Sequence, residues 1–171
     1  MDFNVYCMSE ALKQAERAFS ENEVPVGAVV ASGNRIIARG YNRVEALRDP
    51  TAHAEIIALT AAAEALQSWR LEEAGIYVTL EPCAMCAGAI LNARISRIYY
   101  GAKDPRFGAC GSRYDLVTGN PYINGAQASG GFFEEESLAL IKRFFVNLRD
   151  KTPENIRRDA RVVDRGGLEN R

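Results

Sequence analysis

A histidine, a glutamate and two cysteines occur at spacings that are typical of a catalytic metal site. His53 is the only histidine of the 171-residue chain, and it stands two residues before Glu55. Cys83 and Cys86 follow later in a Pro-Cys-x-x-Cys motif. One imidazole and two thiolates can hold a divalent cation with a fourth position open for water, and a nearby carboxylate can move protons. We expect one Zn²⁺ per chain, bound by His53, Cys83 and Cys86, with Glu55 as the catalytic residue.

The histidine and the glutamate are expected at the start of a helix. Residues two apart on a helix point to different sides, so His53 and Glu55 could not both reach a metal on its flank. They can converge on a metal that lies beyond the N-terminus. Helix-forming residues predict a helix over 51–66, and the Asp-Pro-Thr sequence at 49–51 provides its start signals.

The cysteine pair predicts a second helix start. Cys83 and Cys86 are three apart and follow Pro82, which places both thiols on one helix face. The positive helix end would stabilise the two thiolates, whose charges offset that of the cation. A Cys-x-x-Cys pair alone can also be a redox pair or half of a structural zinc site, which Cys7 and Cys110 could complete. Neither has a partner at ligand spacing, and so few cysteines do not favour a disulfide framework.

Length and composition favour one cytoplasmic domain. The chain has 47% hydrophobic and 25% charged residues, as is usual for a globular protein. The polar N-terminal segment does not have the pattern of a secretory signal, and no apolar run reaches the length of a membrane span. The net charge of −1 does not indicate a generally basic surface that would bind nucleic acid. Binding of nucleic acid would therefore require a local basic patch.

The hydrophobic pattern alternates between helix and strand periods and predicts an α/β fold. Helices are expected over 4–20, 51–66, from 83 onward and over 134–149, and strands over 24–30, 35–41, 75–80 and 95–100. The first two strands form a hairpin around a turn at 32–34, while 42–50 and 101–133 are expected to be loops. We expect a domain over 1–149 and a charged tail over 150–171, which is disordered or a helical extension.

Longer segments around the motifs resemble the bacterial tRNA-specific adenosine deaminases of the cytidine-deaminase-like zinc superfamily. The segments are EVPVGA at 23–28, DPTAHAE at 49–55, YVTLEPCAMCAGA at 77–89 and GAKD at 101–104 through Gly-Ala at 108–109. The similarity runs from about Tyr6 to Arg149. The His-Ala-Glu and Pro-Cys-x-x-Cys motifs identify only the superfamily, and the residues around them favour the tRNA enzymes. The resemblance implies a three-layer α/β/α fold with a central mixed five-stranded sheet and helices on both faces.

The resemblance further implies conversion of adenosine to inosine at the wobble position of tRNA anticodons. Zinc would activate a water for attack on the base. Glu55 would accept the water proton and deliver it to the ring nitrogen, and in a second step it would protonate the departing amino group, which leaves as ammonia. The partners it implies are the anticodon stem-loop of tRNA and a second copy of the chain, since family members of this size complete the RNA site across a homodimer.

Several substrate contacts are implied in the same way. Asn42 matches the family's base-contacting asparagine, Val26 its pocket wall, and the N–H of Ala54 would help to hold the base. The residues that match the family's two RNA-contacting segments are Lys103, Asp104, Arg106, Phe107 and Asn124. Simpler interpretations are that Asn42 is a turn or cap residue, that Val26 is a core residue, and that 103–107 is an ordinary solvated loop with a turn.

Two positions depart from the family pattern. Gly125 stands where these enzymes commonly carry histidine, and Val146 stands where a basic residue is common. Both departures weaken the RNA-contacting surface and leave the metal site unchanged. An alternative is therefore a deaminase of a free base or nucleoside, such as guanine or cytosine, whose site the tail would close. A second alternative is a non-catalytic RNA-binding module with structural zinc.

Overall fold

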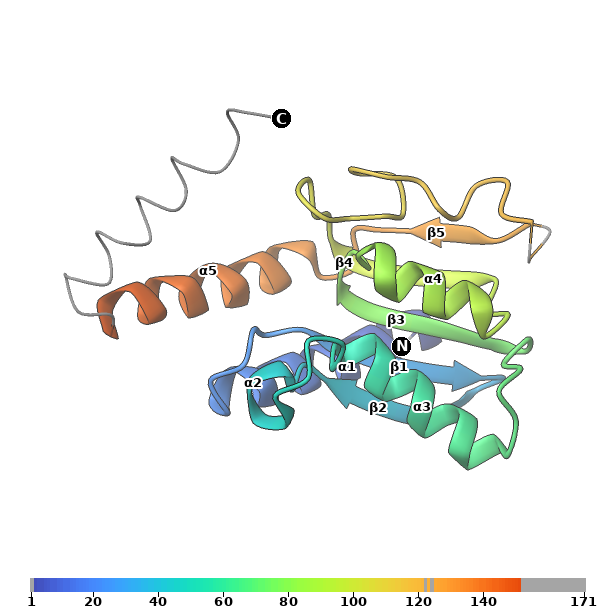
Figure 1. The fold of residues 1–171 in the computed structure, drawn as a ribbon, viewed down its shortest axis with the longest axis horizontal. Coiled ribbons are helices and arrows are strands. Elements are labelled where there is room, and N and C mark those ends of the chain that lie inside the picture. Colours follow the sequence, from blue (N-terminus) through green and yellow to red (C-terminus); the bar gives the residue numbers. More distant parts are fainter. Residues whose placement is uncertain (1, 122, 124, 152–171) are drawn as a thin grey trace.

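A computed structural model describes residues 2–121, 123 and 125–151 as a five-stranded sheet between two layers of helices (Figure 1). The strands are β1 Gly27–Ser32, β2 Arg35–Tyr41, β3 Ala74–Leu80, β4 Arg97–Ala102 and β5 Gln127–Ser129. The helices are α1 Phe3–Ser20, α2 Val44–Leu47, α3 Ala54–Leu66, α4 Ala84–Asn92 and α5 Glu134–Lys151.

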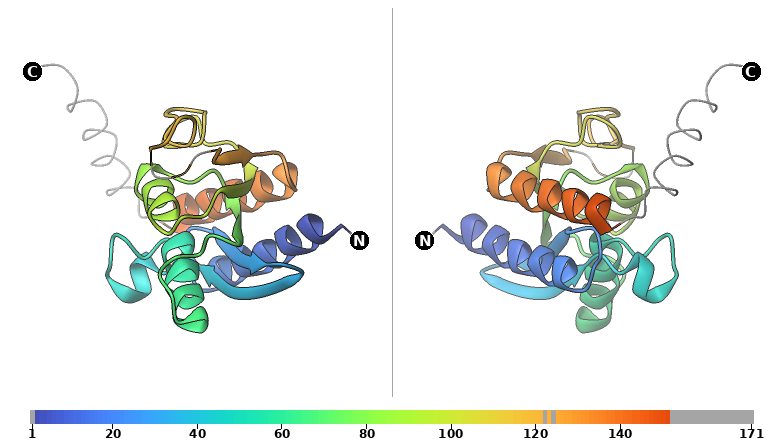
Figure 2. Two further views of the ribbon diagram at one scale, coloured as in Figure 1. Left: turned by 90° about the vertical axis from the view of Figure 1, so that its right-hand side faces the viewer. Right: turned by 90° about the vertical axis from the view of Figure 1, so that its left-hand side faces the viewer.

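The sheet is mixed, as predicted, with the strand order β2-β1-β3-β4-β5. The β1 strand pairs antiparallel with β2 and β3, while β3, β4 and β5 are parallel to one another. Figure 2 shows α1 and α5 on one face of the sheet and α3 and α4 on the other. The predicted three-layer arrangement is therefore confirmed. It places the starts of α3 and α4 at the same end of the sheet, beside the C-terminal end of β3 (Figure 1).

Several boundaries differ from the sequence-based prediction. The first strand begins at Gly27 instead of Val24, because Pro25 has no N–H and the Val26 N–H donates to the Val24 carbonyl in a tight turn. The strand expected over 95–100 lies two residues later, at 97–102. Helix α5 continues to Lys151, two residues beyond its predicted end, and 152–171 of the predicted tail lie outside the described residues.

Both segments that were predicted to be loops contain short regular elements. The four-residue helix α2 lies within 42–50, and the three-residue strand β5 lies within 101–133. Strand β5 is a short edge strand whose pairing with β4 defines it, so its own residues carry little strand pattern. In the described part of the chain, no helix combines the length and the apolar character that crossing a membrane requires.

A glycine brings the sheet close to the start of α3. A side chain at Gly40 on β2 would collide with the carbonyl oxygen of Ala54, and its Cβ would lie 2.7 Å from the backbone nitrogen of Ala58. Because Gly40 has no side chain, the first turn of α3 packs directly on the strand. The residues that start α3 are therefore fixed relative to the sheet.

Candidate metal centre and base pocket

His53 stands at the N-cap of α3, immediately before the first helical residue. The helix begins three residues later than predicted, because the Asp49 carboxylate accepts hydrogen bonds from the Thr51 N–H and hydroxyl and forms a turn there. His53 consequently has an extended backbone, with φ −72° and ψ 155°. Its ring extends beyond the helix end, as the metal geometry requires.

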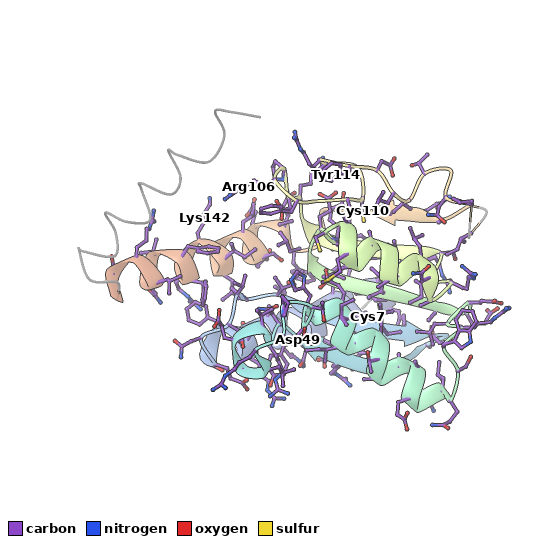
Figure 3. The ribbon with its side chains drawn as sticks, in the orientation of Figure 1. Cys7, Asp49, Arg106, Cys110, Tyr114 and Lys142 are labelled. Atoms are coloured by element: carbon purple, nitrogen blue, oxygen red, sulfur yellow. The ribbon has the colours of Figure 1, made fainter. Side chains whose placement is uncertain are left out.

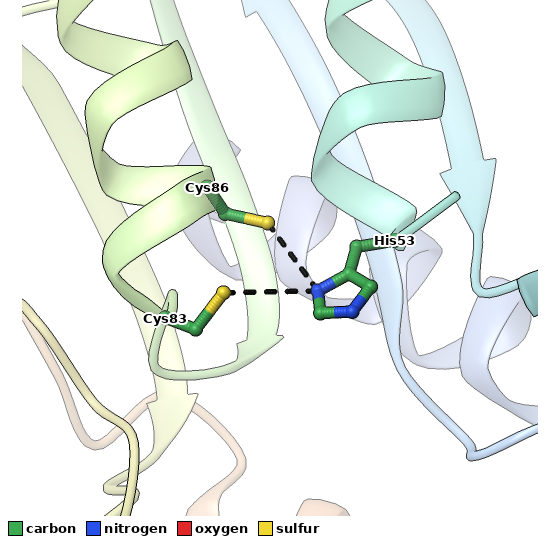
Figure 4. A group of neighbouring side chains, drawn as sticks. All are labelled: His53, Cys83 and Cys86. Carbon is green, nitrogen blue, oxygen red and sulfur yellow. Dashed lines mark hydrogen bonds between the residues drawn. The ribbon is translucent and has the colours of Figure 1, made fainter. Parts of the chain in front are cut away.

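Cys83 occupies the same position on the second helix. It is the N-cap of α4, with φ −71° and ψ 173°, and Cys86 follows in the first turn. The Cys83 sulfur lies 3.7 Å and the Cys86 sulfur 3.5 Å from Nδ1 of His53 (Figure 4). Nitrogen and sulfur ligands of a tetrahedral zinc ion are held about 3.6 Å apart. The three side chains therefore fit a zinc ion that binds to Nδ1 and both sulfurs.

The other two cysteines take no part in this cluster. Within the described residues, His53, Cys83 and Cys86 form the one group whose ligand atoms all lie within 4.8 Å of one another. Cys7 is buried with α1 against the opposite face of the sheet, and Cys110 is a buried free thiol. An all-cysteine cage is therefore excluded for the described part of the chain.

The two thiols of the cluster carry opposite pKa shifts. The hydrogen bond from Cys86, followed by that from His53, lowers the pKa of the Cys83 thiol to about 4 despite its partial burial. The same interaction with Cys83, together with burial, raises the pKa of Cys86. The hydrogen bond with Cys83 also raises the pKa of His53. Protons on the neighbouring groups thus stabilise the Cys83 thiolate. A divalent cation that bound between the three ligands would displace those protons.

Glu55 lies in the first turn of α3 beside the cluster. Its side chain is 4% exposed. Burial raises the pKa of Glu55 to about 7, against the opposing effect of the neighbouring His53. Its carboxyl also interacts with the thiol of Cys86. A buried carboxyl with a pKa near neutrality, next to a metal site, can both accept and return a proton.

A cavity of about 770 Å³ opens onto these side chains and is large enough for a nucleobase and its sugar. His53, Glu55 and Cys83 form one part of its lining. The resemblance-based substrate residues that also line it are Val26, Asn42, Ala54, Lys103, Asp104, Arg106 and Phe107. The structure therefore brings these residues together around one cavity, while Asn124 lies outside the described residues.

Asn42 is held by a buried carboxylate, that of Glu23, to which the sequence-based interpretation assigned no role. Its Nδ2 donates a hydrogen bond of 3.2 Å to Oε2 of Glu23, whose carboxylate also accepts the backbone N–H groups of Glu45 and Ala46. An ionised carboxylate can only accept hydrogen bonds, so it fixes the Asn42 amide with its NH₂ group toward Glu23. Glu23 thus orients Asn42 and also anchors the start of α2.

A second buried carboxylate, Glu81, holds the loop that follows β4. It accepts the backbone N–H groups of Asp104, Cys110 and Ser112, each at 3.0 Å. Glu81 stands two residues before Cys83, so this loop is tied to the turn that carries the metal ligands. The sequence-based interpretation included the Glu-Pro-Cys sequence as part of a motif but assigned no role to its glutamate.

Helix α5 supplies a wall of the cavity that the sequence did not predict. Leu138, Ile141 and Phe145 line the cavity from this helix. Their spacing of three and four residues marks one helix face, but such spacing predicts only that the face packs against something. Which element or cavity it faces depends on the fold of the whole chain.

The chain is similar to known deaminases over most of its length. The MafB19-like deaminase family matches residues 4–149. A tRNA-specific adenosine deaminase of Rickettsia bellii is 46% identical over 145 residues, which cover 84% of this chain and 100% of that protein. A structure solved in a study of A-to-I editing by tRNA:A34 deaminases at the wobble position is 45% identical, with a TM-score of 0.75, and the match covers 79% of this chain and 98% of that one. A Bacillus subtilis guanine deaminase is 34% identical, with a TM-score of 0.56, over 64% of this chain and 69% of that one.

Proposed function

Since the chain belongs to the family of tRNA-specific adenosine deaminases, we propose that it converts adenosine to inosine at the wobble position of tRNA anticodons. The observation that carries this proposal is the convergence of His53, Cys83 and Cys86 beside the buried Glu55, at a cavity that can take a nucleobase. The reaction consumes one water and releases one ammonia, so it needs an activated water and a group that moves protons.

The residues of the site can divide this work among them. His53 Nδ1 and the sulfurs of Cys83 and Cys86 would hold one zinc ion, which lowers the pKa of a bound water toward about 7. Glu55 would accept one proton from that water and transfer it to the ring nitrogen of adenine. It would then pass the second water proton, from the new hydroxyl on C6, to the amino group, which leaves as ammonia. Its position in the first turn of α3, next to His53, puts the proton carrier beside the ligands.

Other residues would hold the base and the RNA around it. The backbone N–H of Ala54 and the amide of Asn42 would contact adenine, and Val26 would pack against it. Lys103, Asp104, Arg106 and Phe107 would contact the nucleotides that flank the target base, and Asn124 would contact the RNA from the second segment. Single-stranded RNA is commonly recognised when unpaired bases stack on aromatic side chains, as an anticodon loop permits.

Three further properties are part of the same proposal. We infer a homodimer, because the resemblance to the tRNA-specific adenosine deaminases implies an RNA site that two subunits complete. We place the reaction in the cytoplasm, where the proposed tRNA substrate is available. The deaminase domain is proposed to span residues 1–149, and the family match over 4–149 supports that extent.

The proposal is tested by treating total tRNA with the purified protein and sequencing for adenosine-to-inosine changes at the wobble position. Glu55→Ala should retain the metal and the fold but lose turnover by at least about 10²-fold, since general acid–base catalysis contributes that much. Unchanged activity of Glu55→Ala would favour the non-catalytic binding module instead.

The metal content of cysteine variants tests the ligand set. Cys86→Ala should lose the metal, whereas Cys7→Ala, which removes an equally buried thiol, should retain it.

Deamination of a free base remains the second candidate, because the guanine deaminase of Bacillus subtilis has the same fold at 34% identity. Incubation of the protein with free guanine, cytosine and adenine, beside an anticodon stem-loop, separates the two candidates. Ammonia release from a free base without inosine in the RNA would overturn the tRNA substrate and leave the metal site intact.

A further inference from the structure

The loop after β4 carries two exposed pairs of an arginine and an aromatic residue. The guanidinium carbon of Arg106 lies 5.3 Å from the ring centre of Phe107, and that of Arg113 lies 5.8 Å from the ring centre of Tyr114. Phe107 is 59% and Tyr114 is 53% exposed. The first pair lines the base cavity, and the sequence resemblance assigned no role to the second.

The two pairs are held next to each other by the backbone of the loop. The carbonyl oxygen of Gly108, the residue after Phe107, accepts the N–H groups of both Arg113 and Tyr114 at 3.0 Å. The carbonyl oxygen of Tyr114 in turn accepts a hydrogen bond from the Gly111 N–H at 2.8 Å. Figure 3 shows the labelled Arg106 and Tyr114 at the same edge of the molecule.

The loop is also firmly attached to the metal-binding turn. Glu81, which is 2% exposed, accepts three of its backbone N–H groups, and a side chain at Gly108 would come within 2.5 Å of the Glu81 carboxyl carbon. A loop whose backbone is already ordered loses little conformational freedom when it binds a ligand. The backbone that carries the pair at 113–114 therefore has a fixed position relative to the base cavity.

The charge of the two arginines is available to a partner. The carboxylate of Asp104 accepts the backbone N–H groups of Arg106 and Phe107, and that of Asp115 accepts the N–H groups of two later residues. Both carboxylates therefore stabilise turns of their own segments through these hydrogen bonds. Among the described residues, neither Arg106 nor Arg113 forms an ion pair with a carboxylate.

We propose that Arg113 and Tyr114 form a second nucleotide-binding subsite, which takes an unpaired base beside the one in the cavity. Tyr114 stacks on that base, and Arg113 contacts its phosphate. This proposal rests on the proposed function, and it adds a binding site for a second nucleotide of the RNA substrate. A flat ring beside a free cation matches single-stranded nucleic acid, which presents a stackable base and a negative charge at each residue. In a chain with a net charge of −1, such a local cationic site supplies attraction that the overall charge does not.

The test measures KM and kcat for inosine formation in an anticodon stem-loop. Tyr114→Ala should raise KM at least about fivefold, the effect expected for loss of one stacked base, and change kcat less than twofold. Tyr114→Phe keeps the ring and should keep KM. The plot of log kcat/KM against log salt has a negative slope, and Arg113→Gln should make this slope less steep by about one, as expected for loss of one phosphate contact.

Matched controls lie away from this end of the sheet. Tyr6→Ala removes an exposed tyrosine from α1, and Arg35→Gln removes an exposed arginine at the start of β2. Both should behave as the wild type, and an equal rise of KM in Tyr6→Ala would overturn the proposal.

Unchanged KM in Tyr114→Ala, with wild-type activity on the RNA, would overturn the subsite alone. Wild-type protein that neither binds nor edits the stem-loop would overturn the proposed function and the subsite together. A change of sedimentation mass in Tyr114→Ala would assign the pair to contact between copies of the chain instead.

Discussion

Two neighbouring groups in the site carry opposite pKa shifts because their surroundings differ. Cys83 has hydrogen-bond donors in Cys86 and His53, which stabilise its thiolate and lower its pKa. Glu55 is enclosed, and burial penalises its charged form and raises its pKa. A bound dication would replace the protons shared among the three ligands and would favour the ionised form of each. The metal-free site thus holds protons that metal binding must release.

The reactivity of Cys83 follows from its low pKa. In metal-free protein, a thiol with a pKa of about 4 is already ionised at pH 6, so its alkylation rate should stay nearly constant between pH 6 and pH 8. An ordinary thiol would react about tenfold faster per pH unit over that range. Burial raises the pKa of Cys7 to about 11 and that of Cys110 to about 12, so these two should remain unmodified in the folded protein.

Iodoacetamide labelling followed by mass spectrometry of the digested protein measures each rate separately. Zinc added before the reagent should protect Cys83, because its sulfur would then be a ligand. A Cys83 rate that climbs tenfold with each pH unit would contradict the lowered pKa. Labelling of Cys7 in the folded, metal-free protein would show that removal of the metal had opened the core.

At the scale of elements, the sequence predicted the helices and strands that carry the ligands. Ligand spacing is a local property, so the placement of His53 and Cys83 at helix starts could be inferred before any fold was known. The exact start of α3 could not, because Asp49 can cap a helix or form a turn with Thr51, and only the turn fits here. The roles of Glu23 and Glu81 also escaped prediction, since their partners are backbone N–H groups of distant segments.

Two glycines, Gly40 at a contact between a strand and a helix and Gly88 inside a helix without such a contact, should respond in opposite ways to replacement by alanine. Gly40→Ala would force β2 away from the first turn of α3 and should destabilise the protein by about 1–3 kcal/mol, the usual cost of overpacking. Gly88 lies inside α4, where a Cβ would meet no atom within 4 Å beyond the adjacent backbone of its own helix. Gly88→Ala should therefore stabilise the protein by about 0.5–1 kcal/mol. Urea unfolding of both variants measures these changes.

The two variants also separate packing from catalysis. Gly40→Ala displaces the turn that carries His53 and Glu55, so its activity should fall more than its stability alone explains under conditions where it is fully folded. Gly88→Ala should keep wild-type activity. If Gly40→Ala were as stable and as active as the wild type, the close contact between β2 and α3 would not position the site.

At the scale of the whole molecule, the cavity is assembled from segments that are far apart in sequence. The segment before β1, the residue that follows β2, the loop after β4 and one face of α5 all line it. A motif search finds the ligands and the loop, because each is continuous in sequence. The wall from α5 arises only when that helix packs beside β4, and a single sequence does not encode this neighbour in any local pattern.

The outer face of α3 offers a surface on which the proposed dimer can be tested. A shallow cavity of about 930 Å³ there is lined by Leu47, Ile56, Ile57 and Trp69, with the exposed Ala61 among them. Exposed apolar surface of this kind is typical of subunit interfaces. We predict a sedimentation mass of about twice the 18.8 kDa of one chain for the wild type. Ala61→Arg should give a monomer, because burying an unpaired charge in an interface is strongly unfavourable.

Ser20→Arg provides the control, since it adds the same charge at an exposed position at the end of α1. It should sediment as the wild type does. If the RNA site is completed across two subunits, monomeric Ala61→Arg should keep its metal and its fold but lose activity on the anticodon stem-loop. A monomeric Ala61→Arg with full activity on the stem-loop would show that one chain suffices for the reaction. A dimeric Ala61→Arg would place the interface elsewhere on the molecule, and a monomeric wild type would contradict the dimer itself.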